Sequence, residues 1–126
     1  MNADVEAWAA YAREDLAVAI AALAAGWLNS ACFHAQQCGE KWLKALLVHH
    51  SQPPPRAHDL DYLLDLLEGF MTISPSVREA SLVLTQYAVV SRYPDGEPID
   101  QEEAVLAVEH AKQIQAWAEG QIPGIG

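Results

Sequence analysis

One stretch, from Asn29 to His50, constrains the fold more than the rest of the sequence. Its small and apolar residues recur every three or four positions, which is the spacing of one face of an α-helix. They are Ala31, Ala35, Cys38, Trp42, Ala45 and Leu46. Glu40 precedes Lys44 by four residues, an order that suits a helical ion pair. The spacing predicts a long helix with a buried apolar face and a separate polar strip in water that consists of His34, Gln37, Lys41 and Lys44.

Gly39 lies in the middle of this predicted helix. A glycine in a helix interior costs ~1 kcal/mol relative to alanine, so its missing Cβ should serve a close contact. Ala31 and Ala35 fall with Gly39 on one strip of very small side chains. We therefore expect the backbone of a neighbouring helix to lie against Gly39, and we expect this helix to occupy the centre of the protein.

The residues before this stretch predict a second long amphipathic helix. Asn2 or Asp4 is a suitable N-cap, and Gly26 is a natural C-terminal stop. Asp15 lies close to the apolar stripe, and we interpret it as a carboxylate at the rim or in an ion pair, outside the chemistry of the protein. The stripe itself consists of Val5, Trp8, Ala12, Leu16, Ile20 (with Ala19) and Leu23.

Three more helices are expected after the successive prolines Pro53–Pro55, which cannot continue a helix. Their expected ranges are 58–69, 74–93 and 100–120, and the first of them is short. Its buried residues should be Leu60, Leu63, Leu64 and Leu67. We interpret His58 as a hydrogen-bonding residue at the start of this short helix, although a catalytic role stays open. No strand pattern appears, so the predicted fold class is all-α, an up-and-down bundle of four main helices and one short helix.

Composition limits the compartment and the partners. The 126 residues fit a single domain, 1–126, with a frayed tail over about 121–126. The net charge of −10, with only seven Lys and Arg, excludes a broad basic surface and leaves only focused contacts with nucleic acid. Cys32 and Cys38 cannot bridge within one helix, and unpaired thiols suit a reducing cytoplasm. The longest apolar run, Ala17–Ala25, is too short to span a bilayer. We expect a cytoplasmic protein that does not contact a membrane.

The sequence has no glycine-rich phosphate loop, no zinc-type cluster and no nucleophile elbow, so we expect neither a metal ion nor a cofactor. The main concentration of reactive groups is SRYPDGE at 91–97. Arg92 is the group there that could hold a phosphate through two parallel hydrogen bonds. An Arg at a helix C-terminus can also serve only the last carbonyl groups, and this alternative stays open. Arg78 lies on the same side of the predicted helix and extends a polar stripe toward Arg92.

Four segments together resemble a HEPN domain (higher eukaryotes and prokaryotes nucleotide-binding), of the small prokaryotic type encoded beside a minimal nucleotidyltransferase. They are Glu14-Asp15-Leu16, FHAQQCGEKWLKALL at 33–47, AHDLDYLL at 57–64 and SRYPDGE at 91–97. The resemblance implies a helical homodimer with a nucleotidyltransferase partner. It also implies that the protein descends from toxins of toxin–antitoxin pairs, many of which cleave RNA without a metal ion.

The motif of such nucleases is an Arg, a gap of four to six residues and then a His, and the two copies of the motif meet in a cleft between subunits. Arg92 matches the Arg, whereas Glu97 stands where the His is expected, and Pro98 and Ile99 occupy the longer gaps. An ordinary carboxylate is a weaker base than imidazole near neutral pH. We therefore expect Arg92, Tyr93 and Arg78 to bind RNA or nucleotide, and we expect endoribonuclease activity at Arg92 and Glu97 to be weakened or lost.

Two alternatives remain open from the sequence. The chain could be a non-catalytic helical module that binds a nucleotide or a partner protein. It could also be a helical dimer in which SRYPDGE is merely structural, and this reading predicts that no nucleotide binds. RNA cleavage that depends on Arg92 separates the first reading from both alternatives.

Overall fold

The computed structural model describes residues 2–88 and 97–126 of the chain. Arg92 and Tyr93 lie outside the described residues. Helices, and no strands, form within the described ranges, which confirms the all-α class. In chain order they are α1 (Ala3–Ala25), α2 (Leu28–His49), α3 (Leu60–Leu67), α4 (Pro75–Leu84), the 3₁₀-helix η1 (Thr85–Tyr87) and α5 (Gln101–Gln121).

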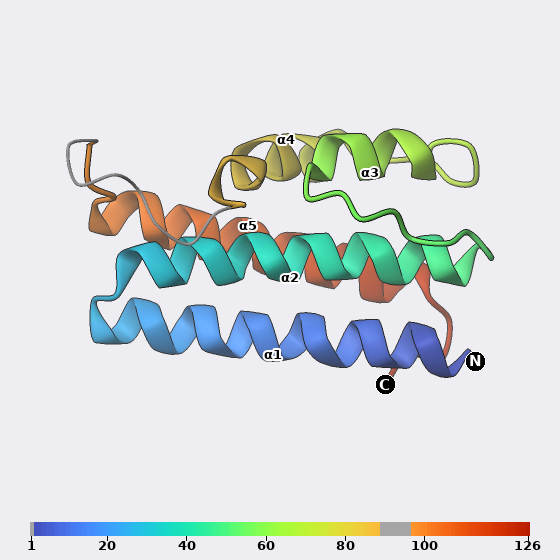
Figure 1. Cartoon of the computed structure of the whole chain (residues 1–126), viewed down its shortest axis with the longest axis horizontal. Helices are drawn as coiled ribbons and strands as arrows, with labels where there is room; N and C mark the ends of the chain where they lie inside the picture. Colours follow the sequence, from blue (N-terminus) through green and yellow to red (C-terminus); the bar gives the residue numbers. More distant parts are fainter. Residues whose placement is uncertain (1, 89–96) are drawn as a thin grey trace.

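The three long helices α1, α2 and α5 lie alongside one another, and α3 and α4 cover the side of α2 that faces away from α1 (Figure 1). The helix α2 contacts each of the other elements, so its predicted central position is confirmed. Residues 50–59 run from the end of α2 back along it to the start of α3. Both chain termini lie at the same end of the bundle (Figure 1).

The apolar face of α2 is buried as its spacing predicts, because all six residues of the predicted stripe are fully inaccessible to solvent. Gly39 is also buried, but side chains and not a helix backbone lie against it. A Cβ at Gly39 would stand 2.9 Å from Leu60 Cδ2, 3.3 Å from Ile114 Cδ1 and 3.6 Å from Leu84 Cδ1. The expectation of a neighbouring backbone was therefore wrong. Three helices, α3, α4 and α5, converge on the glycine through their side chains.

The helix ends follow the local sequence closely. The Asn2 side chain accepts a hydrogen bond from the Asp4 N–H at 2.7 Å, and Gly26 ends α1 with a positive φ of 81° that suits glycine. The Asp100 carboxylate accepts from the Glu103 N–H at 2.8 Å and begins α5. These caps depend on residues close in sequence, which explains why they were predictable.

Two expectations about the helices were wrong. Ile20, placed in the buried stripe of α1, is 44% exposed, and the face against the core is completed by Ala19 and Ala22. The helix expected over 74–93 ends earlier, because α4 stops at Leu84 and the chain tightens into η1. In η1 the Thr85 hydroxyl turns to the start of α3, where its oxygen accepts the Leu60 N–H at 3.2 Å. A tertiary contact therefore coincides with the change of helix type.

The remaining parts of the chain close the core. The four leucines predicted for α3 are all fully buried. Beyond α5, Ile122 is buried and Ile125 packs partly against the core, whereas fraying of the tail in solution stays a prediction. None of the described helices combines the length and the hydropathy that crossing a membrane requires.

Candidate functional site

The residues predicted to bind RNA or nucleotide differ in what the structure says of them. Glu97 is exposed at the beginning of the described segment that leads into α5, while Arg92 and Tyr93 fall in the segment that is not described. Arg78 lies on α4 and joins it to α3 through three carboxylates. Its guanidinium contacts Asp61 at 2.5 Å, Asp65 at 3.0 Å and Glu68. A role for Arg78 in binding stays a prediction, and in this arrangement its charge is already offset.

The positive charges of other basic side chains are also balanced by nearby carboxylates. Of the six Lys and Arg in the described residues, five contact a carboxylate within 4 Å. The five are Arg13, Lys41, Lys44, Arg78 and Lys112. The sixth, Arg56, is exposed on the segment before α3. The described surface therefore offers little positive charge to a nucleic-acid backbone, as the net charge predicts.

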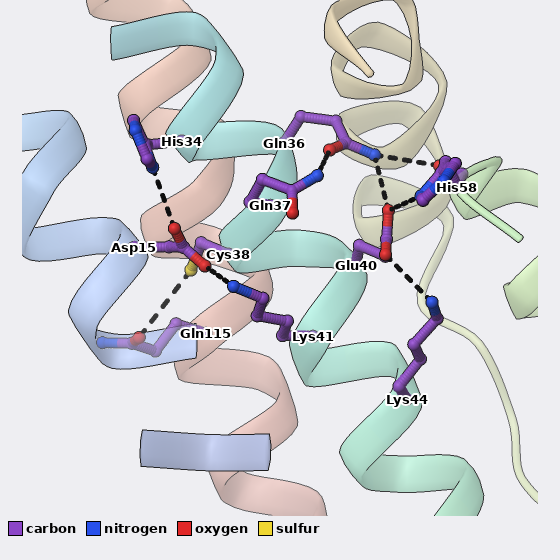
Figure 2. Close-up of polar contacts among 10 residues, drawn as sticks. All are labelled: Asp15, His34, Gln36, Gln37, Cys38, Glu40, Lys41, Lys44, His58 and Gln115. Atoms are coloured by element: carbon purple, nitrogen blue, oxygen red, sulfur yellow. Dashed lines mark hydrogen bonds and ion pairs between the residues drawn. The ribbon is translucent and has the colours of Figure 1, made fainter. Parts of the chain in front are cut away.

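Two buried carboxylates on either side of α2 organise the polar interior (Figure 2). The first is Asp15 of α1, whose side chain is only 9% exposed. It accepts a hydrogen bond from His34 Nδ1 at 2.9 Å and forms an ion pair with Lys41. The interpretation of Asp15 as an ion-pair carboxylate is confirmed, and its burial is greater than a rim position would give. This cluster joins α1 to α2.

The second carboxylate is Glu40 of α2, with a side chain 6% exposed. Its Oε2 contacts Lys44 Nζ at 2.9 Å, which confirms the predicted ion pair. Its Oε1 contacts His58 Nδ1 at 2.9 Å and accepts a longer hydrogen bond of 3.3 Å from Gln36 Nε2. Lys44 was expected on a polar strip in water, and this was wrong, because its side chain is only 7% exposed. The Trp8 ring lies beside it, with its centroid 5.8 Å from Lys44 Nζ.

The two clusters share one pattern, in which a buried carboxylate holds an imidazole by one oxygen and a lysine by the other. An ionised carboxylate only accepts hydrogen bonds, so Nδ1 of each imidazole carries the proton that it shares. The Nε2 atom of a neutral ring in this position has a free lone pair. The two histidines differ in access, since the side chain of His58 is 65% exposed and that of His34 is 29% exposed.

Sequence reasoning did not bring these residues together. His58 was interpreted as a residue of the helix start, but its ring contacts Glu40 of α2, 18 residues earlier in the chain. The spacing of Glu40 and Lys44 was visible, whereas the return of residues 50–59 along α2 has no local signal. Asp15 and His34 likewise depend on the packing of α1 against α2.

The cysteine thiols are not part of a reactive site. Cys32 and Cys38 form no disulfide, as predicted, and both are fully buried. Burial, together with the nearby charge of Asp15, raises the pKa of Cys38 to about 12, so this thiol stays protonated and unreactive at neutral pH. In residues 2–88 and 97–126, no group of three or more His, Cys, Asp or Glu could hold a metal ion.

A shallow pocket of about 290 Å³ lies between the proline segment and α3. Its lining has no charged side chain and consists of Leu47, Gln52, Pro53, Pro55, Tyr62, Leu66 and Phe70. Tyr62 supplies a titratable group to this lining, whereas Asp15 and Glu40 each gather an imidazole and a lysine.

Comparison with solved structures gives close similarity over almost the whole chain. TT1696 from Thermus thermophilus shares 31% identity with a TM-score of 0.84, covering 94% of this chain and 98% of that one. ST0689, an archaeal HEPN homologue, shares 27% identity with a TM-score of 0.78, covering 93% of this chain and 96% of that one. A HEPN domain protein from Thermotoga maritima, tm0613, shares 25% identity with a TM-score of 0.78, covering 98% and 100%.

A search of curated proteins finds no match. The family model of the HEPN domain matches residues 5–121, which takes in α1 to α5 and both carboxylate clusters. The match extends over nearly all of the sequence and agrees with the structural similarities, two of which are to proteins described as HEPN. The chain belongs to the HEPN domain family.

Proposed function

We propose that this chain is the HEPN component of a toxin–antitoxin-like pair with a nucleotidyltransferase, and that it binds RNA or nucleotide through Arg92 at a cleft between two copies. The distribution of charge carries the proposal. Five of the six Lys and Arg in the described residues contact carboxylates. We therefore expect Arg92 to make the focused phosphate contact, with Arg56 as the competing candidate. An Arg supplies the bidentate geometry that a phosphate accepts.

Exposed apolar side chains support the proposal that a second copy of the chain packs beside the helices that flank the segment with Arg92. Leu82 on α4 is 52% exposed, and Val105 and Leu106 in the first turns of α5 are 37% and 51% exposed. These two helices precede and follow the segment that contains Arg92. A homodimer that covers these side chains would bring two copies of the segment toward one cleft, which is the arrangement that the resemblance implies.

Catalysis by the motif itself should be weak. Glu97 stands where the motif has a histidine, and carboxylates as a class match imidazole poorly as acid–base groups near neutral pH. It also adds negative charge near the proposed phosphate site. A metal-independent endoribonuclease that relied on Arg92 and Glu97 alone should therefore be much slower than one with a histidine in this position.

Binding of a fluorescently labelled single-stranded RNA, measured by polarisation at several salt concentrations, tests the proposal. Arg92→Ala should weaken binding at least tenfold with an unchanged melting temperature, and Arg92→Lys should restore only part of it, because a point charge replaces a two-pronged donor. Arg56→Ala is the matched control and should change binding less than twofold. Equal binding by Arg92→Ala and the unmodified protein would remove the basis for a phosphate contact at Arg92.

A second candidate is a non-catalytic module that binds a nucleotide or a partner protein, favoured by Glu97 in place of the histidine. Both candidates predict that the chain co-purifies with a nucleotidyltransferase encoded beside it. They differ in RNA cleavage, which only the first candidate allows.

A further inference from the structure

The pocket between the proline segment (residues 52–55) and α3 takes no part in the function proposed above. We infer that this pocket is a docking site for a segment of a partner protein. The segment inserts one large apolar side chain into the pocket and carries lysine or arginine residues beside that side chain. Such docking would not depend on Arg92 or on RNA.

Apolar side chains that stay open to solvent form much of the pocket. Tyr62, Leu66 and Phe70 follow one another at intervals of four residues and are 46%, 36% and 47% exposed. Pro53 and Pro55 belong to the lining as well. The volume of about 290 Å³ lies just below the usual range for small-molecule pockets. The pocket therefore suits a single large side chain better than a whole cofactor.

One wall of the pocket is held in place within the chain itself. The Phe70 ring stacks on the His50 ring, with ring centroids 5.6 Å apart and an angle of 23° between the planes. The N–H groups of Phe70 and Met71 both donate to the Leu67 carbonyl oxygen and fix the turn after α3. Burial, and then the neighbouring His49, lower the pKa of His50, so this imidazole adds no positive charge near pH 7. A wall that is already ordered lowers the entropy cost of docking.

The proline segment offers hydrogen-bond acceptors and lacks donors. Proline has no backbone N–H, so the run from Pro53 to Pro55 presents only carbonyl oxygens. Within residues 2–88 and 97–126, no group donates a hydrogen bond to the carbonyl oxygens of residues 52–55. A partner that brings N–H donors, from its backbone or from a cationic side chain, can satisfy these acceptors.

The carboxylates on α3 and just after it favour a positively charged partner. Asp61, Asp65 and Glu68 share the single guanidinium of Arg78, so negative charge is in excess there. Asp65 and Glu68 are both more than half exposed, and Asp65 directly precedes Leu66 of the pocket lining. The net charge of −10 on the whole chain acts in the same direction.

Two other occupants fit these charges less well. A second copy that docked this same face about a two-fold axis would bring Asp65 and Glu68 of the two copies together, and like charges disfavour such an interface. An acidic segment could pair with Arg56, which is exposed directly after Pro55, but it would also meet the excess of carboxylates on α3. A basic segment therefore directs its positive groups toward α3 and away from Arg56.

Binding of synthetic peptides to the full chain, measured by fluorescence polarisation, tests this docking site. The probe is a fluorescein-labelled peptide with one central phenylalanine flanked by lysines. One control peptide has alanine in place of the phenylalanine and measures binding through charge alone. The other has glutamates in place of the lysines. The probe should bind at least about tenfold more tightly than either control, because each control lacks the apolar or the electrostatic contribution.

Variants of the protein locate the binding. Tyr62→Ala removes part of the pocket wall and should weaken binding of the probe at least about fivefold, as expected for a contact that anchors an interface. Its melting temperature should change little, because Tyr62 is about half exposed. Tyr11→Ala, the matched control, removes a tyrosine that is 57% exposed on α1, and it should leave binding within about twofold. Arg56→Glu should strengthen binding of the probe, because it removes a positive charge next to the proline segment.

Each contrary outcome has a distinct meaning. No saturable binding of the probe at millimolar concentration would overturn the inference, and so would equal binding of the peptides with phenylalanine and with alanine. Equal losses in Tyr62→Ala and Tyr11→Ala would place the binding outside the pocket. Tighter binding of the glutamate peptide, weakened by Arg56→Glu, would assign the pocket to an acidic partner. A lower mass of Tyr62→Ala in light scattering would assign it to a second copy of the chain.

Discussion

Replacing Gly39 tests the packing at the centre of the bundle. A Cβ at this position already stands 2.9 Å from Leu60 Cδ2 and 3.3 Å from Ile114 Cδ1. Leu60 and Ile114 are fully buried, so neither side chain can move into solvent to make room. Leu60 is further restrained because its N–H is hydrogen-bonded to Thr85. A larger residue at Gly39 must therefore push apart α3 and α5.

The expected magnitudes follow from two opposing effects. Alanine gains ~1 kcal/mol of helix propensity over glycine but forces Leu60 from its rotamer at a cost of about 0.5–1.5 kcal/mol, so Gly39→Ala should be nearly neutral. Leucine inserts three further carbons, and overpacking of this kind costs about 1–3 kcal/mol or more. Because the propensity gain and the rotamer cost nearly cancel, the overpacking cost remains, and Gly39→Leu should lower the free energy of unfolding by about 2 kcal/mol.

Thermal and urea unfolding of the two variants measure these values, and a loss of about 2 kcal/mol corresponds to roughly 8 °C in melting temperature for a chain of this size. Gly120→Leu is the matched control, because Gly120 lies in α5 with no atom within 4 Å of an added Cβ. It should be neutral or slightly stabilising. A melting temperature for Gly39→Leu equal to or above that of the unmodified protein would refute the packing argument.

Two further predictions concern assembly and pH. Light scattering at micromolar concentration should give twice the mass of one chain, and Leu106→Glu on the exposed face of α5 should shift the protein toward monomer; a monomeric unmodified protein would remove the basis for a shared cleft. The raised pKa of Cys38, about 12, means that the unfolded thiol ionises above about pH 8.5 while the folded one does not. This contribution to stability is complete below that pH and is lost as pH rises toward 12. The free energy of unfolding should therefore fall less steeply with pH for Cys38→Ala than for the unmodified protein over this range. Parallel plots of unfolding free energy against pH would contradict the raised pKa of Cys38.

Much of the fold was predictable because helix formation and helix capping depend on residues that are close together in the sequence. Asn2, Gly26 and Asp100 mark helix ends through hydrogen bonds or backbone angles within a few residues, and the apolar spacing of α2 marks its buried face. The family resemblance rested on segments that the family match also includes. Ile20 was misplaced because alanines, which lack a strong apolar signal, complete the buried face of α1.

The candidate site was less predictable because its members come from different elements. Helical periodicity states which residues share a face, but it does not state what will cover that face. Lys44 was expected in water, but it is buried in an ion pair with Glu40 and lies near the Trp8 ring of α1. The return of residues 50–59 along α2 sets the His58 ring against a carboxylate 18 residues away.

The sequence by itself determined the helices, their caps, the central position of α2 and the scarcity of positive charge, since each depends on neighbouring residues or on composition. Only the tertiary structure decided which polar groups are buried and which imidazole contacts each buried carboxylate. The physical reason is that a charged side chain is buried only where partners compensate its lost hydration. Glu40 has one such partner in Lys44, four residues on, and a second in His58, which the chain brings into contact only after it has turned back along α2.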